Sequence, residues 1–434
     1  MKKIFTLLIC LMVLFSFTGC TGNEPSEPEN VQDVENNKEK PAEQEEQPPE
    51  EEEEETGGIW VGTWASAQYY GDNSGDGGKK SALNISKNLP DSTLRQIIRT
   101  SSGGEQLRLT FSNEYGETPM TIQAVHIAKA TVPAKSDIDV STDTPVTFDN
   151  GSAGVTIPAG QKVFSDPVDF PVDALERIAV SVYFGEMPET VSCHVAARAN
   201  SFIEEGNVIS NESLNGSTNT HWFVLCNVDI LSPAESKSIV ALGDSITDGY
   251  GTKDEEYLRW VDILMNNLQA NEATKHLSVI NMGIGTNTLL NQQNPTAVID
   301  RFKRDVLEQP EVGYLVFLIG VNDLGGSASA ESMINAYDEI IKAAQENGIK
   351  VYGGTITPTG KQDDKREAVN DWLRLQYREG NMHGLADFDE LLKNPDNPNT
   401  MLPEYDNDGL HPSIAGYAAM GEYVYALIAE DNGN

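Results

Sequence analysis

The chain has 434 residues with 67 acidic and 30 basic side chains, which gives a formal net charge of −37 and a pI near 4.3. At this length we expect two or three domains, and a hydrophobic content of 39 % is enough to build cores, which excludes full-length disorder. The acidic balance excludes a nucleic-acid binder, because no basic stripe exists to neutralise phosphates, and it opposes adsorption to anionic lipid headgroups.

The first residues have the pattern of an export signal. A pair of lysines precedes an uncharged, largely apolar stretch, residues 4–17, which is shorter than the roughly 20 residues that span a bilayer. Thr18, Gly19 and Cys20 follow this stretch, and the run from Phe17 to Cys20 resembles a bacterial lipoprotein signal, with Phe17 where an aliphatic residue is usual. The resemblance implies that residues 1–19 are removed and that Cys20 is lipidated, which would place the protein on the extracellular face of the cell envelope. An ordinary secretory signal is the alternative, and either one predicts export.

Residues 20–58 are predicted to be a disordered acidic tether. Between residues 21 and 58 there are 15 acidic and 2 basic side chains, a net charge of −13, so that residues 59–434 carry −26. A segment dominated by Glu, Pro, Gln and Asn cannot bury enough apolar surface to offset its ordering entropy, and its like charges extend it.

Residues 59–233 predict an all-β sandwich of jelly-roll type. Short runs of β-branched and aromatic residues alternate with turn signals, and no long stretch has helical periodicity. The clearest strands are predicted at residues 59–64, 106–111 and 177–184. Trp60, Trp64 and Trp222 could form a sugar-stacking platform, but their residue type favours core or interdomain packing.

Residues 234–434 predict an α/β domain. Apolar strands alternate with helical stretches, which is typical of a parallel sheet covered by helices on both faces, with its site at the carboxyl ends of the strands. Strands are predicted at residues 238–242, 277–282, 314–319, 351–356 and 385–388, and helices at 256–270, 330–347, 362–378 and 414–430.

Two cysteines, Cys193 and Cys226, remain after the signal region. In an exported protein they could form one disulfide, and two buried free thiols are the alternative. Neither has the spacing of a metal site. The run from Asp72 to Gly77 imitates the start of a calcium loop, but Leu83 stands where a bidentate Glu is required. We therefore expect no metal and no cofactor.

Four short segments carry residues suited to acyl transfer. Ser245 follows the first predicted strand of the α/β region, and Asp408 and His411 lie just before the last helix, so that a nucleophile, a base and an orienting acid are present. The run 281–287 ends the second strand with a glycine-rich turn, and Asn322 follows the third. Backbone and side-chain N–H groups at such positions can stabilise an oxyanion.

Together these segments resemble the SGNH, or GDSL, hydrolases, whose four blocks appear in order between residues 238 and 427. The resemblance implies a three-layer α/β/α hydrolase fold with Ser245 as nucleophile, His411 as general base and Asp408 as its orienting acid. It also implies an oxyanion hole formed by the Ser245 N–H, a backbone N–H of the second block and the Asn322 amide.

The second block departs from its usual form. Relatives often read Gly-Ile-Ser-Gly-Asn, whereas residues 283–287 here read Gly-Ile-Gly-Thr-Asn, so the usual donor glycine aligns with Thr286 and a glycine precedes it at Gly285. Either residue could donate its N–H. We favour Gly285, because a turn with positive φ suits glycine better.

The β region also resembles the amino-terminal domain of some bacterial SGNH esterases that act on polysaccharides, through residues 60–65 and 107–116. This resemblance implies a surface-anchored esterase that removes acetyl or other short acyl groups from plant polysaccharide such as xylan. The expected partners are a small acyl ester or an acetylated polysaccharide, no nucleic acid, and a membrane only through the lipid anchor. A lysophospholipase or lipid esterase and a non-catalytic glycan-binding lipoprotein are the alternatives.

Overall fold

Antiparallel strands make up the region before residue 233, and a parallel sheet follows it. The computed structural model describes residues 58–70, 89–290, 296–360 and 363–433. The predicted signal, almost all of the predicted tether and the calcium-like run from Asp72 lie outside these ranges. The described residues from Gly58 onward belong to one compact unit.

Two antiparallel sheets form the sandwich, and their facing side chains make its core. In one sheet the strand order is β1-β15-β4-β8, with β9 also paired to β4, and in the other it is β13-β12-β3-β10-β5-β6, with β7 paired to β5. The core between them contains Phe111, Phe148 and Val182, all fully buried. The bounds of the first sheet are β1 (Ile59–Ala65), β15 (Leu225–Ser232), β4 (Gly104–Ser112), β8 (Lys162–Phe164) and β9 (Val168–Val172). Those of the second are β13 (Ser217–Asn219), β12 (Ser201–Glu205), β3 (Ser92–Arg99), β10 (Arg177–Phe184), β5 (Met120–Lys129), β6 (Thr144–Val146) and β7 (Val155–Ile157).

A third, small sheet has the order β14-β11-β2 and consists of β14 (Trp222–Phe223), β11 (Ser192–His194) and β2 (Tyr69–Tyr70). A short 3-10 helix, η1 (Val140–Thr142), precedes β6. Trp64 and Trp222 are buried and pack edge to face with ring centroids 5.0 Å apart. These two tryptophans therefore belong to the core rather than to a sugar-stacking platform.

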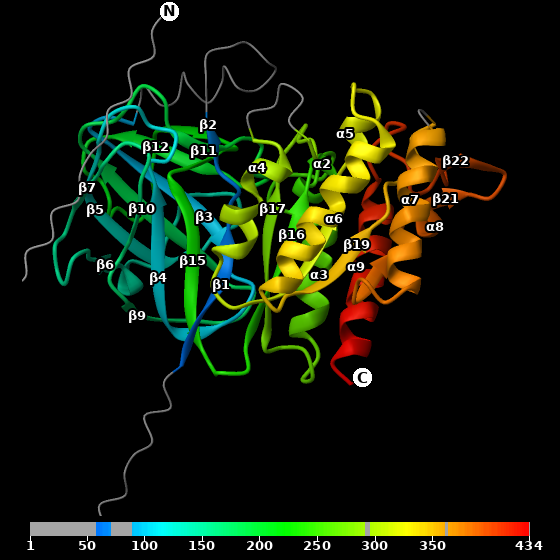
Figure 1. Ribbon diagram of the computed structural model, residues 1–434. Coiled ribbons are helices and arrows are strands. Elements are labelled where there is room, and N and C mark those ends of the chain that lie inside the picture. The colour runs from blue at the N-terminus through cyan, green and yellow to red at the C-terminus, as the bar shows by residue number, and fades with distance from the viewer. Residues whose placement is uncertain (1–57, 71–88, 291–295, 361–362, 434) are drawn as a thin grey trace, which may run out of the picture. The chain divides into compact units, whose positions relative to one another are not determined.

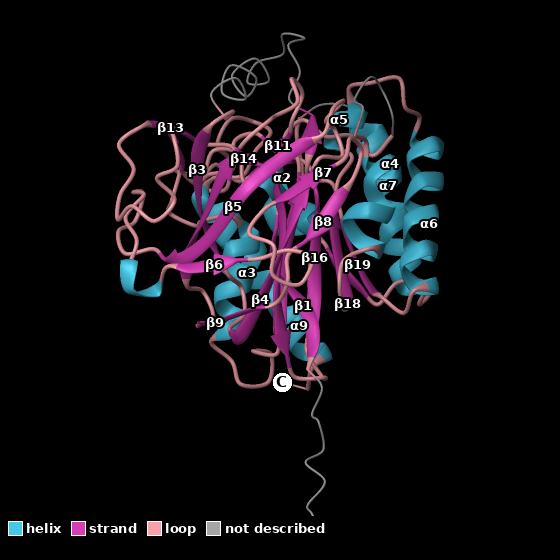
Figure 2. Ribbon diagram, turned by 90° about the vertical axis from the view of Figure 1, so that its left-hand side faces the viewer, coloured by secondary structure: helices cyan, strands magenta, loops and turns pink. Residues whose placement is uncertain are grey.

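The second region is a five-stranded parallel sheet in the order β17-β16-β18-β19-β20. Figure 2 shows α3 and α9 on one side of this sheet and α4, α6 and α7 on the other, which confirms the predicted α/β/α class. Its strands are β16 (Lys237–Gly243), β17 (Leu277–Gly283), β18 (Val312–Leu318), β19 (Lys350–Gly354) and β20 (Gly384–Ala386), followed by the hairpin β21 (Lys393–Asn394) and β22 (Asn397–Met401). Its helices are α2 (Ser245–Asp248), α3 (Trp260–Gln269), α4 (Val298–Phe302), η2 (Lys303–Leu307), α5 (Val321–Leu324), α6 (Ala330–Glu346), α7 (Asp363–Arg378), α8 (Phe388–Leu392) and α9 (Ile414–Asp431).

Most predicted boundaries lie within a few residues of these elements, and α3 shows the main difference. It begins at Trp260 rather than at residue 256, because Glu255 and Tyr257 have φ values of 65° and 53°, which a right-handed helix does not allow. None of the helices within the described ranges is both long and apolar enough to cross a bilayer.

The sandwich joins the parallel sheet at β1, which runs beside β17 (Figure 1). The Gly62 N–H donates to Ser238 Oγ at 3.2 Å, and Ser278 Oγ donates to the Gly62 carbonyl at 2.6 Å. The two regions thus meet through buried hydrogen bonds and not only through side-chain packing.

The two cysteines are not paired, so the disulfide that the sequence allowed does not form. Cys193 lies on β11 and Cys226 on β15, in different sheets, and both are free and buried. Cys226 Sγ instead donates to the Thr110 carbonyl at 3.4 Å. Burial raises the pKa of both thiols to about 12, so the reactive thiolate is scarce at neutral pH.

We expect residues 56–434 to show almost no reaction with a thiol-specific dye while folded, and to release two equivalents of thiol after unfolding in guanidinium without reductant. Prior treatment with a reductant should leave this count unchanged. In a Cys193→Ser variant the count should fall to one. An unfolded chain that needed reductant before it reacted would show a disulfide and contradict the assignment.

Candidate active site

Ser245 stands at the turn from β16 into the short helix α2. β16 ends at Gly243, where a Cβ would lie 2.2 Å from Thr247 Oγ1 and 2.5 Å from the Leu318 carbonyl, so only glycine fits. The Asp244 carboxylate then accepts the Ile246 N–H at 3.0 Å and caps the helix. This turn holds Ser245 at the carboxyl edge of the sheet, where the fold class predicts a site.

His411 and Asp408 lie in the loop before α9 and complete a hydrogen-bonded chain with Ser245. Ser245 Oγ is 2.9 Å from His411 Nε2, and His411 Nδ1 is 3.0 Å from Asp408 Oδ2. Partial burial opposes ionisation of Asp408, but hydrogen bonds from the His411 backbone and ring outweigh it and hold the pKa of this carboxyl below its usual value. Asp408 therefore stays ionised and orients the imidazole. The structure brings together all three residues that the sequence singled out.

Tyr250 covers the imidazole, and sequence reasoning did not find it. Its ring stacks on His411 with centroids 4.1 Å apart and planes 30° apart, while 46 % of the residue stays exposed. Arg198, from the β region, lies 5.8 Å from the Tyr250 ring centroid. The sequence signal for Tyr250 is its position next to Gly249, immediately after the first block.

Asn322 lies at the same edge and is tied to the second block. It follows Gly320, whose φ of 114° turns the chain out of β18 into α5. Asn322 Nδ2 donates to the Asn287 carbonyl at 2.8 Å. The side-chain amide is thus fixed toward the glycine-rich turn. The expected role of Asn322 as an oxyanion donor requires this orientation.

The conformation of the turn at residues 284–287 differs from the one that favoured Gly285 as the donor. The Asn287 N–H bonds to the Ile284 carbonyl at 3.1 Å, which makes Gly285 the second and Thr286 the third residue of a β-turn. The positive φ, 62°, falls on Thr286, so the expectation of a left-handed Gly285 is wrong. The Gly285 N–H points instead to Asp248 Oδ2, at 3.2 Å.

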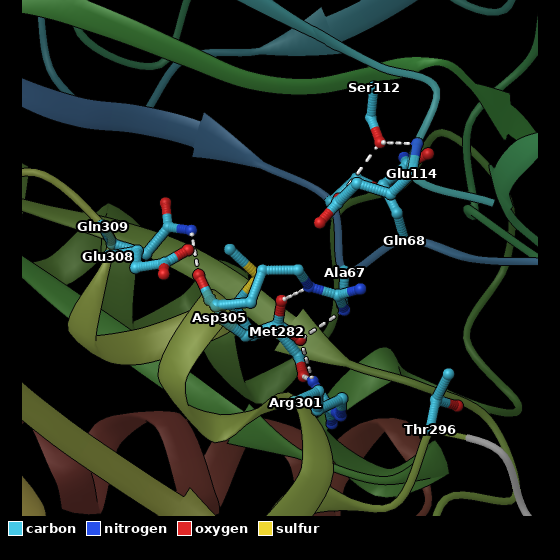
Figure 3. Close-up of polar contacts among 12 residues, drawn as sticks. Ala67, Gln68, Ser112, Glu114, Met282, Thr296, Arg301, Asp305, Glu308 and Gln309 are labelled. Atoms are coloured by element: carbon cyan, nitrogen blue, oxygen red, sulfur yellow. Dashed lines mark hydrogen bonds and ion pairs between the residues drawn. The ribbon is translucent and has the colours of Figure 1, made fainter. Parts of the chain in front are cut away.

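A buried arginine, also missed by sequence reasoning, fixes the strand ends that carry the first two blocks. The Arg301 guanidinium donates to the Gly243 carbonyl and to the Met282 carbonyl, both at 2.8 Å. It also pairs with Asp305 at 2.7 Å (Figure 3). Burial opposes ionisation of Asp305, but the neighbouring arginines outweigh it and keep its pKa below the usual value. The sequence signal that could have revealed this ion pair is the spacing of four residues between Arg301 and Asp305.

A hollow of about 360 Å³ opens beside Asn322 and the loop that carries Asp408 and His411. Its wall includes Asn322 and Gly409 from the site and the apolar side chains of Val321, Leu324 and Leu410. Such a hollow suits a small apolar group next to a carbonyl held at Asn322. Among the described residues, no cluster of three or more His, Cys, Asp or Glu side chains is arranged to hold a metal ion.

Comparison with known proteins identifies the second region. Residues 241–419 match the GDSL-like Lipase/Acylhydrolase family. Similar solved structures include a G-D-S-L family protein from Desulfitobacterium hafniense (25 % identity, 44 % of this chain and 99 % of that one, TM-score 0.37) and an acetyl xylan esterase (20 %, 44 % and 99 %, TM-score 0.36). A third is a carbohydrate acetylesterase from Sinorhizobium meliloti (13 % identity, 45 % and 99 %, TM-score 0.36). No protein of curated function matches the chain.

The chain therefore contains a hydrolase domain of the GDSL-like lipase/acylhydrolase family, as its four segments predicted. By class the protein is a carboxylic ester hydrolase.

The buried carboxyl of Asp244 gives the site a testable pH dependence. Burial raises its pKa to about 7, and Oδ2 has no hydrogen-bond partner among the described residues. The unfolded chain loses this proton near pH 4 and the folded chain near pH 7, so over this range the folded state binds more protons and stability falls as pH rises.

Asp244→Asn cannot ionise, and its side-chain oxygen can still accept the Ile246 N–H. We expect the free energy of unfolding of Asp244→Asn, relative to the native protein, to rise between pH 4 and pH 7 and to level off above. Denaturant titrations at pH 4.5, 6 and 8 measure this difference, in which titrations common to both proteins cancel. A difference that does not change with pH would contradict the assignment.

Proposed function

We propose that the protein is a serine esterase that removes acetyl or other short acyl groups from plant polysaccharide such as xylan. The observation that supports it most is the continuous hydrogen-bonded chain from Ser245 through His411 to the ionised Asp408. The hollow beside Asn322 has room for a small acyl group. The net charge of −26 on residues 59–434 suits a neutral substrate better than an anionic lipid surface.

In the proposed mechanism the Ser245 hydroxyl passes its proton to His411 Nε2 while Oγ forms a bond to the ester carbonyl carbon. The Ser245 N–H, the Asn322 amide and a backbone N–H of the turn at residues 285–286 stabilise the oxyanion. Because the Gly285 N–H is directed at Asp248, we assign the turn's contribution to Thr286. Each such donor is worth about 2.7–4 kcal/mol in the transition state.

The intermediate collapses when the bond to the alcohol breaks and His411 gives its proton to the leaving oxygen. Water then attacks the acyl-enzyme, again with His411 as base, and the free acid and the Ser245 hydroxyl are regenerated. Asp408 orients the imidazole and stabilises its charge in both steps.

A substrate panel tests this function. Residues 56–434 should release acetate from acetylated xylan and hydrolyse p-nitrophenyl acetate faster than its long-chain analogues. Ser245→Ala should lower kcat roughly 10⁴–10⁶-fold, whereas Ser210→Ala, an exposed serine of the β region, should not change it. A preference for glycerophospholipids would favour the lipid-esterase alternative, and unchanged hydrolysis in Ser245→Ala would refute the catalytic assignment.

We further propose that the enzyme is held at the extracellular face of the envelope by lipid on Cys20. The full-length chain, expressed in a bacterial host, should appear in the membrane fraction with a lipid-modified amino-terminal peptide by mass spectrometry. Cys20→Ser should abolish the modification, while Cys10→Ser, which the signal carries away, should leave it intact. An unmodified Cys20 in the membrane fraction would rule out the anchor.

A further inference from the structure

A histidine of the β region enters the hydrolase region and contacts the helix that carries Ser245. His194 ends β11 and is 3 % exposed. Its Nε2 lies 2.9 Å from Oδ1 of Asp248, the last residue of α2. Its Nδ1 lies 2.9 Å from the Ala67 carbonyl. The proposed mechanism uses neither His194 nor Asp248, although both are buried and titratable.

The hydrogen-bonding partners of the His194 ring show which of its nitrogens donates to the Ala67 carbonyl. A carbonyl oxygen only accepts, so the hydrogen on Nδ1 is donated to Ala67. The short contact between Nε2 and Asp248 then requires one more proton, shared between the ring and the carboxyl group. Whichever atom carries it, the pair is a strong buried link, and Tyr69 and Trp222 enclose the ring at centroid distances of 6.1 and 5.7 Å.

The second oxygen of Asp248 extends this link to the oxyanion turn. Oδ2 accepts the Gly285 N–H, and Gly285 immediately precedes Thr286. The turn ends at Asn287, whose carbonyl accepts the Asn322 amide. A path of hydrogen bonds therefore runs from the β region through Asp248 to the Gly285 N–H, one peptide before the one that the proposed mechanism directs at the substrate oxygen.

We propose that His194 is a positioning residue of the oxyanion hole, and that the β region is in this way a working part of the active site. The proposal rests on the esterase function proposed above. By holding Asp248 in one orientation, His194 fixes the Gly285 amide and thus the direction of the next peptide. A displacement of that peptide weakens the contact with the oxyanion more than it weakens substrate binding, so the effect falls on kcat rather than on KM.

Two substitutions by amide residues test the two hydrogen bonds of His194 separately. In His194→Gln the side-chain amide nitrogen can reach the place of Nε2 and still donate to Asp248. In His194→Asn the shorter amide reaches only the place of Nδ1 and donates to Ala67. We expect His194→Asn to lower kcat for p-nitrophenyl acetate by about 10- to 100-fold with little change in KM. His194→Gln should restore most of that loss.

Variants of Asp248 provide an independent comparison if His194→Asn does not fold. Asp248→Asn can accept from Gly285 and donate to a neutral His194, whereas Asp248→Ala can do neither. We expect Asp248→Ala to lower kcat as His194→Asn does, and the double variant to be little worse than either single one, because both break one path. Hydrogen exchange of the segment 283–287 should be fast in Asp248→Ala and slow in Asp248→Asn.

Equal kcat values for His194→Asn and His194→Gln, or unchanged exchange in Asp248→Ala, would overturn the positioning role and leave the esterase function intact. A native enzyme that hydrolyses no ester would overturn the proposed function itself and the positioning role with it. The two failures are thus distinguishable within one set of measurements.

Discussion

The buried Arg301 guanidinium is the interaction on which the site depends most. It binds the carbonyl groups at the ends of β16 and β17, the two strands that lead into Ser245 and into the turn at residues 284–287. The Gly243 carbonyl also accepts the Ile284 N–H at 3.2 Å, and a buried carbonyl left without any donor costs about 1–3 kcal/mol. Asp305 balances the charge, so that the cation can remain in the interior. Arg301 thus adds a bridge between the ends of two strands that already pair directly from Lys237 to Gly243.

The second constraint is the attachment of the sandwich to the parallel sheet. β1 donates to and accepts from serines of β16 and β17, and the bonds are buried. On the same side of the molecule His194 binds Asp248, and Arg198 lies against the tyrosine that covers His411. The β region thus contacts the hydrolase region along the sheet and again at the edge where the chemistry is proposed. This arrangement is that of an integral support, because the hydrogen bonds of Gly62 and of His194 join buried groups of the two regions.

Local sequence patterns predicted the fold class and the segments of the site well. Strand and helix periods are properties of neighbouring residues, and the segments around Ser245, Asn322 and His411 carry their signals within a few positions. The residues that the sequence did not reveal act over long distances. Arg301 binds strand ends 58 and 19 residues away, and His194 reaches a carboxylate 54 residues away. Such contacts depend on how the sheets pack, which no local pattern encodes.

The turn at 284–287 and the cysteines show the same limit. A glycine is the better residue for a left-handed conformation, but in the β-turn closed by the hydrogen bond from Asn287 to Ile284 the positive φ belongs to Thr286. The cysteine count allowed a pair, but the two cysteines lie in separate sheets and both are free. In both cases the residue types allow more than one conformation or pairing, and the contacts in the folded protein determine which one forms.

The unpaired cysteines have a consequence for how the protein matures. Residues 58–433 are held together by packing and hydrogen bonds, with no covalent cross-link among the described residues. Folding of this body consumes no oxidant and releases no reducing equivalents. The described residues therefore need no thiol-oxidising partner to reach this structure, whichever redox compartment they fold in.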